Sequence, residues 1–384
     1  VLQRAVEASR RKGDPREQAG LLHNLAVVYQ EQGNYAAARR FYEESLNGFR
    51  ESGDRHGEAI ALGNLGAIYE SQGQWTKAAV LYERSLIIQR ELGDRASEAR
   101  TLINLGSVYQ SQGNIAEAIA LYEESLAILR QLGDRHGEAN ILSNLGNVYQ
   151  SQGRWAEATA LYEESLAILW QLGDRRGEAN VLSNLGNVYQ SQWRLAEAAA
   201  LYEGSLAILR QLGDRQGEAN TLNNLGIVYQ VQGRYTEARS LYQESLAIKQ
   251  LLGDQQGIAS TLHQLGTLAQ ISGAYEEALH YYEEASAISE RLGDIHSLAI
   301  TFGNLGTIFE NQGDFQQALG YLDKSAELLE RIGDASNLAT AYRAIARMRQ
   351  ELGEFEASVA ALSQALTLSF KIAPRPVLET ARQV

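Results

Sequence analysis

The chain repeats itself every 40 residues, and this period limits its possible folds more than any other feature. Residues 121–150 and residues 161–190 differ at only three positions. The same frame continues without insertion, and a small residue marks it once per period: Ala26, Gly66, Gly106, Gly146, Gly186, Gly226, Gly266, Gly306 and Ala346. A unit this short cannot bury its apolar side chains alone. The period therefore predicts one stacked array, rather than the two or three globular domains that 384 residues would otherwise suggest.

Each unit is predicted to contain two helices, so the expected fold class is all-α. In the unit around Gly146, the first helix follows Asp134, which is a good N-cap, and apolar residues recur at three- and four-residue spacing. Gly153 suits the left-handed turn after this helix, and the second helix continues to Gly173. Ala158 and its equivalents are small enough to let two helices approach closely.

Counting from Ala19, the period divides the chain into three parts. Residues 1–18 match the second helix and loop of a truncated repeat. Residues 19–378 hold nine 40-residue units that form one solenoid, and residues 379–384 begin a further helix. A solenoid normally ends in a polar capping repeat, and neither end has a convincing one. We therefore expect a fragment of a longer protein whose flanking domains carry any enzymatic output.

One turn departs from the pattern. Trp193 stands where Gly153 and Gly233 occupy the equivalent turns. A left-handed backbone is unfavourable for a tryptophan, so the turn at Trp193 is expected to differ from its neighbours.

Composition excludes several classes of function. The net charge of −13 argues against general binding to nucleic acid or to an anionic membrane surface. No apolar run is long enough to span a membrane. The absence of cysteine excludes disulfides and thiolate metal sites, and it is consistent with a reducing compartment, so we expect a cytoplasmic protein.

No catalytic or metal-binding constellation is recognisable, so we expect no enzyme activity, no cofactor and no metal. His56, His136 and His296 occupy one loop position in different units, too far apart to share a metal. The arginines after the loop aspartates, and pairs such as Glu123-Glu124, are expected to be solvated surface.

Asparagines recur on one face of the first helix. They stand at one position in most units, where Gln264 replaces them once, and further copies lie four residues before or three residues after it. An amide both donates and accepts hydrogen bonds, so a row of amides can hold the backbone of an extended peptide. An alternative is that these amides only bond to the neighbouring helix pair. The candidate ligand-binding residues are Asn64, Asn104, Asn140, Asn144, Asn147, Asn180, Asn184, Asn187, Asn220, Asn224 and Asn304.

The motif Asn-Leu-Gly-x-x-Tyr, followed by Gly-x-Trp/Tyr-x-x-Ala and Tyr-x-x-Ser/Ala-Leu, resembles the tetratricopeptide repeat pattern. The 40-residue unit is similar to the repeats of LGN/Pins-type adaptors, of kinesin light chain and of bacterial signalling proteins. This resemblance implies a right-handed superhelical solenoid of antiparallel helix pairs, with about nine repeats plus partial repeats at both ends. It also implies that the first helices line a concave groove.

The predicted function is a non-catalytic protein-interaction scaffold that binds an extended peptide or a partner domain in that groove. No nucleic acid or membrane partner is expected. The alternative is a structural or sensor arm of a larger signalling protein, which self-associates or restrains a neighbouring NTPase or effector domain. Near-identical units favour this alternative, because a repetitive groove offers a peptide little to fix its register.

Overall fold

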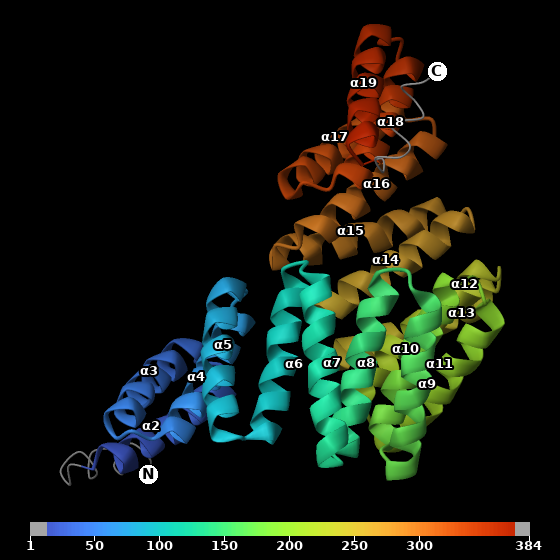
Figure 1. Cartoon of the computed structure of the whole chain (residues 1–384). Coiled ribbons are helices and arrows are strands. Elements are labelled where there is room, and N and C mark those ends of the chain that lie inside the picture. The colour runs from blue at the N-terminus through green and yellow to red at the C-terminus, as the bar shows by residue number, and fades with distance from the viewer. Residues whose placement is uncertain (1–13, 373–384) are drawn as a thin grey trace, which may run out of the picture. The chain divides into compact units, whose positions relative to one another are not determined.

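The computed structural model describes residues 14–372, and these residues form eighteen α-helices and no strand (Figure 1). The prediction of an all-α fold is confirmed. Residues 1–13, which hold most of the truncated repeat predicted at 1–18, lie outside the described residues. So does the further helix predicted at 379–384.

The chain divides into two compact units, residues 1–188 and residues 189–384. The helices of the first unit are α2 (Pro15–Glu31), α3 (Tyr35–Glu51), α4 (Arg55–Ser71), α5 (Trp75–Leu92), α6 (Arg95–Ser111), α7 (Ile115–Leu132), α8 (Arg135–Ser151) and α9 (Trp155–Leu172). Helix α10 (Arg175–Ser191) includes the boundary. The second unit continues with α11 (Leu195–Leu212), α12 (Arg215–Val231), α13 (Tyr235–Leu252), α14 (Gln255–Ile271), α15 (Tyr275–Leu292), α16 (Ile295–Asn311), α17 (Phe315–Ile332), α18 (Ala335–Glu351) and α19 (Phe355–Ile372).

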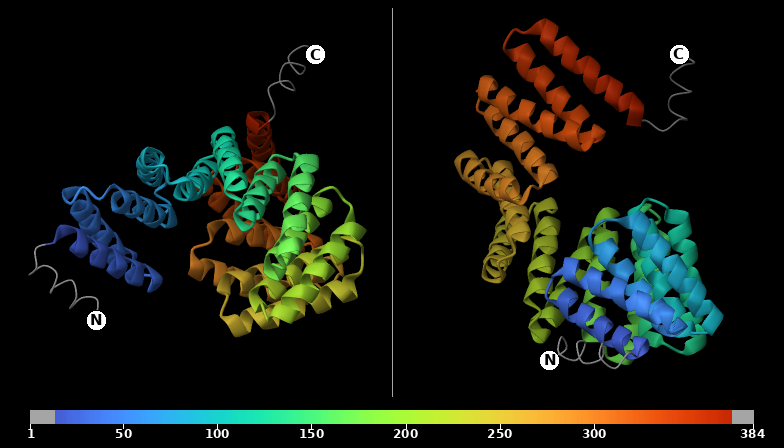
Figure 2. Two further views of the ribbon diagram at one scale, coloured as in Figure 1. Left: turned by 60° about the horizontal axis from the view of Figure 1, so that its bottom comes forward. Right: turned by 90° about the vertical axis from the view of Figure 1, so that its left-hand side faces the viewer.

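Consecutive helices form pairs that pack side by side within each unit, as the further views in Figure 2 also show. We call the even-numbered helices, from α2 to α18, the first helices of the pairs. Asp134 caps α8 as predicted, because its carboxylate accepts a hydrogen bond of 2.9 Å from the backbone N–H of Gly137. The turn after α8 contains Gly153 in the left-handed conformation, and a left-handed Gly173 follows α9.

A tyrosine from each second helix fills the interior of most pairs. Tyr162 on α9 is fully buried and packs against Gly146 on α8. A methyl group on Gly146 would lie 2.7 Å from a ring carbon of Tyr162, so a larger residue there would force the ring or the helix to shift. One turn further along α9, the buried Ser165 donates a hydrogen bond to the backbone carbonyl of Ala139. The fully buried tyrosines are Tyr42, Tyr82, Tyr122, Tyr162, Tyr202, Tyr242 and Tyr282.

The turn at Trp193 does not differ from its neighbours, so that prediction was wrong. Trp193 has a φ of 60°, close to the 72° of Gly153. Its N–H donates to the carbonyl of Gln190 over 3.0 Å, and the equivalent bond from Gly153 has the same length. These bonds and the packing of the flanking helices hold the backbone in place. The indole points outward and is 76% exposed.

The glycine at the tyrosine contact is predicted to be necessary for stability. Replacing Gly146 with alanine should lower the free energy of unfolding by about 1–3 kcal/mol, because the added methyl group overpacks the contact with Tyr162. Urea unfolding followed by circular dichroism measures the effect. Gly63 is the matched control, since a methyl group there would meet only Ser85 Oγ at 3.7 Å. Gly63→Ala should be neutral or stabilising, and equal losses in both variants would contradict the proposed role of the contact.

The left-handed tryptophan is predicted to cost stability. Replacing Trp193 with glycine should raise the free energy of unfolding by about 1–2 kcal/mol, because glycine adopts φ near 60° without a steric penalty. A thermal melt measures the gain. Trp170→Gly is the comparison at an equally exposed tryptophan inside a helix, and it should be destabilising. A melting temperature of Trp193→Gly at or below that of the wild type would refute the prediction.

Candidate functional site

The eleven candidate asparagines all lie on first helices, and we call them the asparagine face. On α8, Asn140, Asn144 and Asn147 share one side of the helix, and each keeps some contact with solvent. Across the set, the residues at the position of Asn144 are half-buried, and those at the position of Asn140 are exposed. The full set is Asn64, Asn104, Asn140, Asn144, Asn147, Asn180, Asn184, Asn187, Asn220, Asn224 and Asn304.

Two members of this face bond to histidines of the preceding pair. The amide nitrogen of Asn64 lies 3.2 Å from Nε2 of His23, and that of Asn304 lies 3.2 Å from Nε2 of His263. Burial lowers the pKa of both histidines, which favours the neutral ring that can accept a hydrogen bond from an amide. For Asn64 and Asn304, bonding to the neighbouring pair therefore accounts for the amide.

Asn147 also has a structural partner. The hydroxyl of Tyr162 lies 2.6 Å from Oδ1 of Asn147 and 3.0 Å from Oε1 of Gln150. The asparagine thus helps to satisfy a buried tyrosine within its own pair. The sequence analysis had treated Asn147 as a candidate ligand-binding residue and did not predict its contact with Tyr162.

Asn104 and Asn144 are different, because neither side-chain amide forms a hydrogen bond with any residue that the structure describes. Both are half-buried, so their amides are held in place by packing while they remain open to solvent. The difference comes from the preceding pair. The residues 41 positions earlier are Gly63 and Ile103, which offer no polar side chain, whereas Asn64 and Asn304 find His23 and His263 there. The type of residue 41 positions before an asparagine is therefore a sequence signal that separates open amides from amides bonded to a histidine.

Hollows lie along the asparagine face in the second unit. One, of about 500 Å³, is lined by residues of α12, α13, α14 and the segment between α13 and α14, including Asn220, Asn223 and Asn224. Another, of about 520 Å³, is lined by Asn304, Arg343 and other residues of α16, α17 and α18. The first hollow brings two of the predicted site residues, Asn220 and Asn224, to one place.

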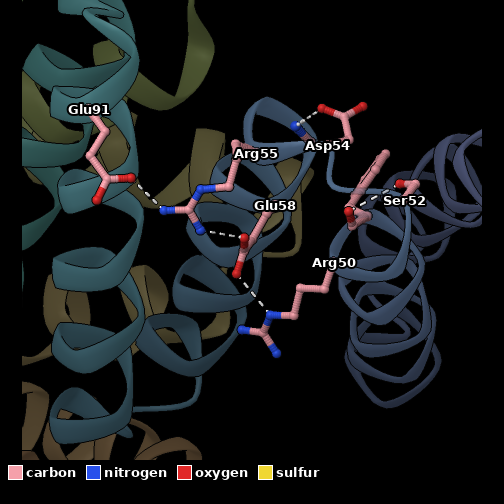
Figure 3. A network of polar contacts seen from close by, with 8 residues as sticks. Arg50, Ser52, Asp54, Arg55, Glu58 and Glu91 are labelled. Atoms are coloured by element: carbon pink, nitrogen blue, oxygen red, sulfur yellow. Dashed lines mark hydrogen bonds and ion pairs between the residues drawn. The ribbon is translucent and has the colours of Figure 1, made fainter.

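Where one pair meets the next, arginines surround a buried glutamate (Figure 3). Glu58 on α4 is only 7% exposed. It accepts a hydrogen bond of 2.8 Å from Arg50 of the preceding pair and one of 2.7 Å from Arg55. Arg55 also bonds to Glu91 at 2.5 Å. We call this group the junction network, and its equivalents are centred on Glu98, Glu138 and Glu218.

The junction network corrects two expectations. Loop arginines such as Arg135 are not simply solvated, because Arg135 bonds to the buried Glu138. Glu124 and Glu164 are not free surface charges either, since they accept hydrogen bonds from Arg90 and Arg130 of the preceding pair. The sequence signal was an arginine eight residues before the glutamate in four units, at Glu58, Glu98, Glu138 and Glu218.

The loop histidines pair with aspartates rather than with each other. Nδ1 of His56 lies 3.7 Å from Asp94, and His136 and His296 stand in the same relation to Asp174 and Asp334. Within residues 14–372, no group of three or more His, Cys, Asp or Glu side chains could hold a metal ion. Among the helices of that range, none combines the length and the apolar character needed to cross a bilayer.

Comparison with protein families identifies the repeat. A family model described as "Tetratricopeptide repeat" matches residues 17–91, 58–131, 97–169, 137–211, 177–250, 217–291 and 297–369. These matches together extend over most of the chain. No match was found among curated proteins.

Solved structures with the same fold include signalling and sensor proteins. BtubC from P. vanneervenii is 26% identical, with a TM-score of 0.52 over 57% of this chain and 92% of its own. A signal transduction ATPase with a tetratricopeptide repeat sensor, from Pyrococcus horikoshii, is 17% identical, with a TM-score of 0.66 over 96% of this chain. This chain covers 54% of that protein's length. The quorum sensor NprR from B. thuringiensis is 16% identical, with a TM-score of 0.63 over 94% of this chain and 99% of its own.

The junction network is predicted to make stability depend on acid pH. Burial acts to raise the pKa of Glu58, but the hydrogen bonds from Arg50 and Arg55 outweigh it, and the pKa is lowered from 4.5. A carboxyl group whose pKa is lowered by folding stabilises the fold above its unfolded pKa, and that stability is lost as the pH falls through the folded pKa. Glu58→Gln should therefore cost about 1–2 kcal/mol at pH 7 and much less near pH 3.

Urea unfolding at several pH values tests this prediction. Glu123→Gln is the matched control, because Glu123 is an exposed glutamate on a second helix. At each pH, the urea midpoint of the control variant should equal that of the wild type. A difference between the wild type and Glu58→Gln that stays constant from pH 7 to pH 3 would argue against an ionic role for Glu58.

Proposed function

This chain belongs to the tetratricopeptide repeat family, and on that premise we propose that it is a non-catalytic scaffold for protein interactions. In this proposal, the asparagine face binds an extended peptide or an extended segment of a partner protein. The first helices form the binding surface, and the second helices support them.

The observation that carries the proposal is the state of Asn104 and Asn144. A half-buried amide with no hydrogen-bond partner among the described residues is held in position, yet its donor and acceptor remain available. Asn140, one turn before Asn144 on α8, adds an exposed amide on the same side of the helix. Neighbouring amides of this kind can pair with the N–H and C=O groups of a peptide backbone whatever its side chains are.

The proposed partner is a protein or peptide, with no cofactor or metal. Nucleic acid and membrane surfaces are not proposed as partners, because the chain carries a net charge of −13 and only five of its residues are lysine. The cytoplasmic location stays a prediction from the cysteine-free composition.

The second candidate is a structural or sensor arm that acts by self-association or by restraining a neighbouring NTPase or effector domain. Two exposed apolar side chains on second helices favour contacts away from the asparagine face. Trp170 on α9 is 73% exposed and Leu251 on α13 is 83% exposed. The similar fold of the tetratricopeptide repeat sensor in the signal transduction ATPase supports this candidate.

The open amides are predicted to contribute directly to peptide binding. A peptide selected on this chain from a random library should bind about tenfold or more weakly to the double variant Asn104→Ala/Asn144→Ala. Each amide that loses a hydrogen bond to the peptide costs about 1 kcal/mol. Isothermal titration measures the affinity. A thermal melt should show that the double variant is as stable as the wild type.

Asn147→Ala is the matched control, because its amide accepts a hydrogen bond from the buried Tyr162. This variant should lower the melting temperature and leave the peptide affinity nearly unchanged. Unchanged affinity in the double variant would overturn the role of the open amides.

Light scattering tests the second candidate, which predicts a mass that rises with protein concentration. That rise should be smaller in Trp170→Arg or Leu251→Gln.

A further inference from the structure

One buried lysine breaks the repeat. Lys249 lies near the end of α13, at a position that Leu129, Leu169 and Leu209 occupy in the preceding units. Like those leucines it is buried, with only 3% of its surface exposed. A leucine would bury the same volume without a charge to desolvate, so packing alone does not explain the ammonium group.

The ammonium group of Lys249 is only partly satisfied. Its Nζ donates a hydrogen bond of 2.9 Å to Oγ1 of Thr261, a neutral acceptor on α14. Oγ1 of Thr261 in turn donates to the carbonyl of Gly257, and Oδ1 of Asn223 on α12 lies 3.5 Å from it. No carboxylate of the described residues forms an ion pair with Lys249. An ammonium group has three protons to donate, so two remain for other acceptors.

The nearest negative charge is already engaged. Asp254 caps α14, and its Oδ1 accepts a hydrogen bond of 2.8 Å from the N–H of Gly257. Its other oxygen accepts one of 3.1 Å from the side chain of Gln216. Asp254 therefore reduces the cost of the buried ammonium through its charge but does not bond to it.

Lys249 also lines a hollow. It takes part in the lining of the 500 Å³ hollow that contains Asn220, Asn223 and Asn224. The four-carbon stem of a lysine is flexible, so the ammonium group can reach a ligand in this hollow while the backbone stays in place. The hollow thus combines a buried cation with amides of the asparagine face.

We propose that this hollow binds a carboxylate group of the bound peptide and that Lys249 is its counter-ion. This inference rests on the proposed function. It adds one point that fixes the position of the peptide along the repeated asparagine face. The asparagine face repeats every 40 residues, whereas the lysine occurs at this position in one unit only. A peptide with one carboxylate at the right place is then fixed along an otherwise repetitive surface.

The lining favours a carboxylate over a phosphate group. Hydrogen bonds from Gly257 and Gln216 lower the pKa of the Asp254 carboxyl, and the ionised carboxylate repels a doubly charged phosphate about twice as strongly as a singly charged carboxylate. A singly charged carboxylate can accept hydrogen bonds from the two remaining N–H groups of the Lys249 ammonium group and from one side-chain amide. The carboxylate belongs either to an acidic side chain or to a peptide C-terminus, and the experiment separates the two.

Nuclear magnetic resonance of the full chain with ¹³C-labelled lysine tests the proposal, because only five lysine signals are expected. Lys249→Leu identifies the signal and introduces the residue found in three other units. The probes are N-acetylglutamate N-methylamide, which has only a side-chain carboxylate, N-acetylalanine, which has only a C-terminal one, and inorganic phosphate. We expect a saturable shift of the Lys249 signal with one of the two carboxylate probes, and no shift of the exposed Lys324.

Burial lowers the pKa of Lys249, so a bound carboxylate should also move its titration midpoint to higher pH. Saturation by the first probe assigns an acidic side chain, and saturation by the second assigns a C-terminus. No saturable shift with either probe, or a shift with phosphate alone, overturns the proposal. These probes do not span the asparagine face, so this result does not depend on whether Asn104 and Asn144 bind a peptide backbone.

Discussion

The contact between a buried tyrosine and a glycine of the facing helix is the interaction on which the rest of this array depends. Tyr162 takes the space that a side chain at Gly146 would need, and the distance between the two helices follows from this fit. The tyrosine hydroxyl then bonds to Gln150 and Asn147 near the end of the first helix. The position of the asparagine face is thus set by the packing of the pair behind it.

At the junctions between pairs, one buried position of the first helix holds either a glutamate bonded to arginines or an apolar residue. In the earlier units a buried glutamate such as Glu138 is held by Arg130 and Arg135. In the later units Ile258 or Leu338 replaces the glutamate, and Gln250 or Glu330 replaces the first arginine. At these two junctions the glutamate and its first arginine are replaced together, so no carboxylate is buried there without that arginine. Trp170 interrupts this pattern, because it replaces the first arginine while Glu178 remains, and Glu178 pairs with Arg175 alone among the described residues.

The period and the local helix signals were enough to predict the all-α fold, the aspartate caps and the close contacts at Ala158, because each depends on neighbours in the sequence or on the repeat itself. The state of each asparagine could not be predicted in the same way. It depends on a residue 41 positions earlier, as with Asn64 and His23, or on a tyrosine 15 positions later, as with Asn147 and Tyr162. The turn at Trp193 was mispredicted because local preference was given more weight than the bonds that fix the turn.

A repetitive binding surface has a problem that a globular one does not, because a ligand shifted by one unit meets the same groups again. Specificity therefore has to come from the positions where the units differ. His23 and His263 form hydrogen bonds with asparagine amides whose equivalents are open in other units. Lys249 places a charge at a position that is uncharged in the other units. A change at such a position alters the surface at one point only. In the proposed function, the irregular positions would therefore fix the position of a ligand, because they are where the units differ.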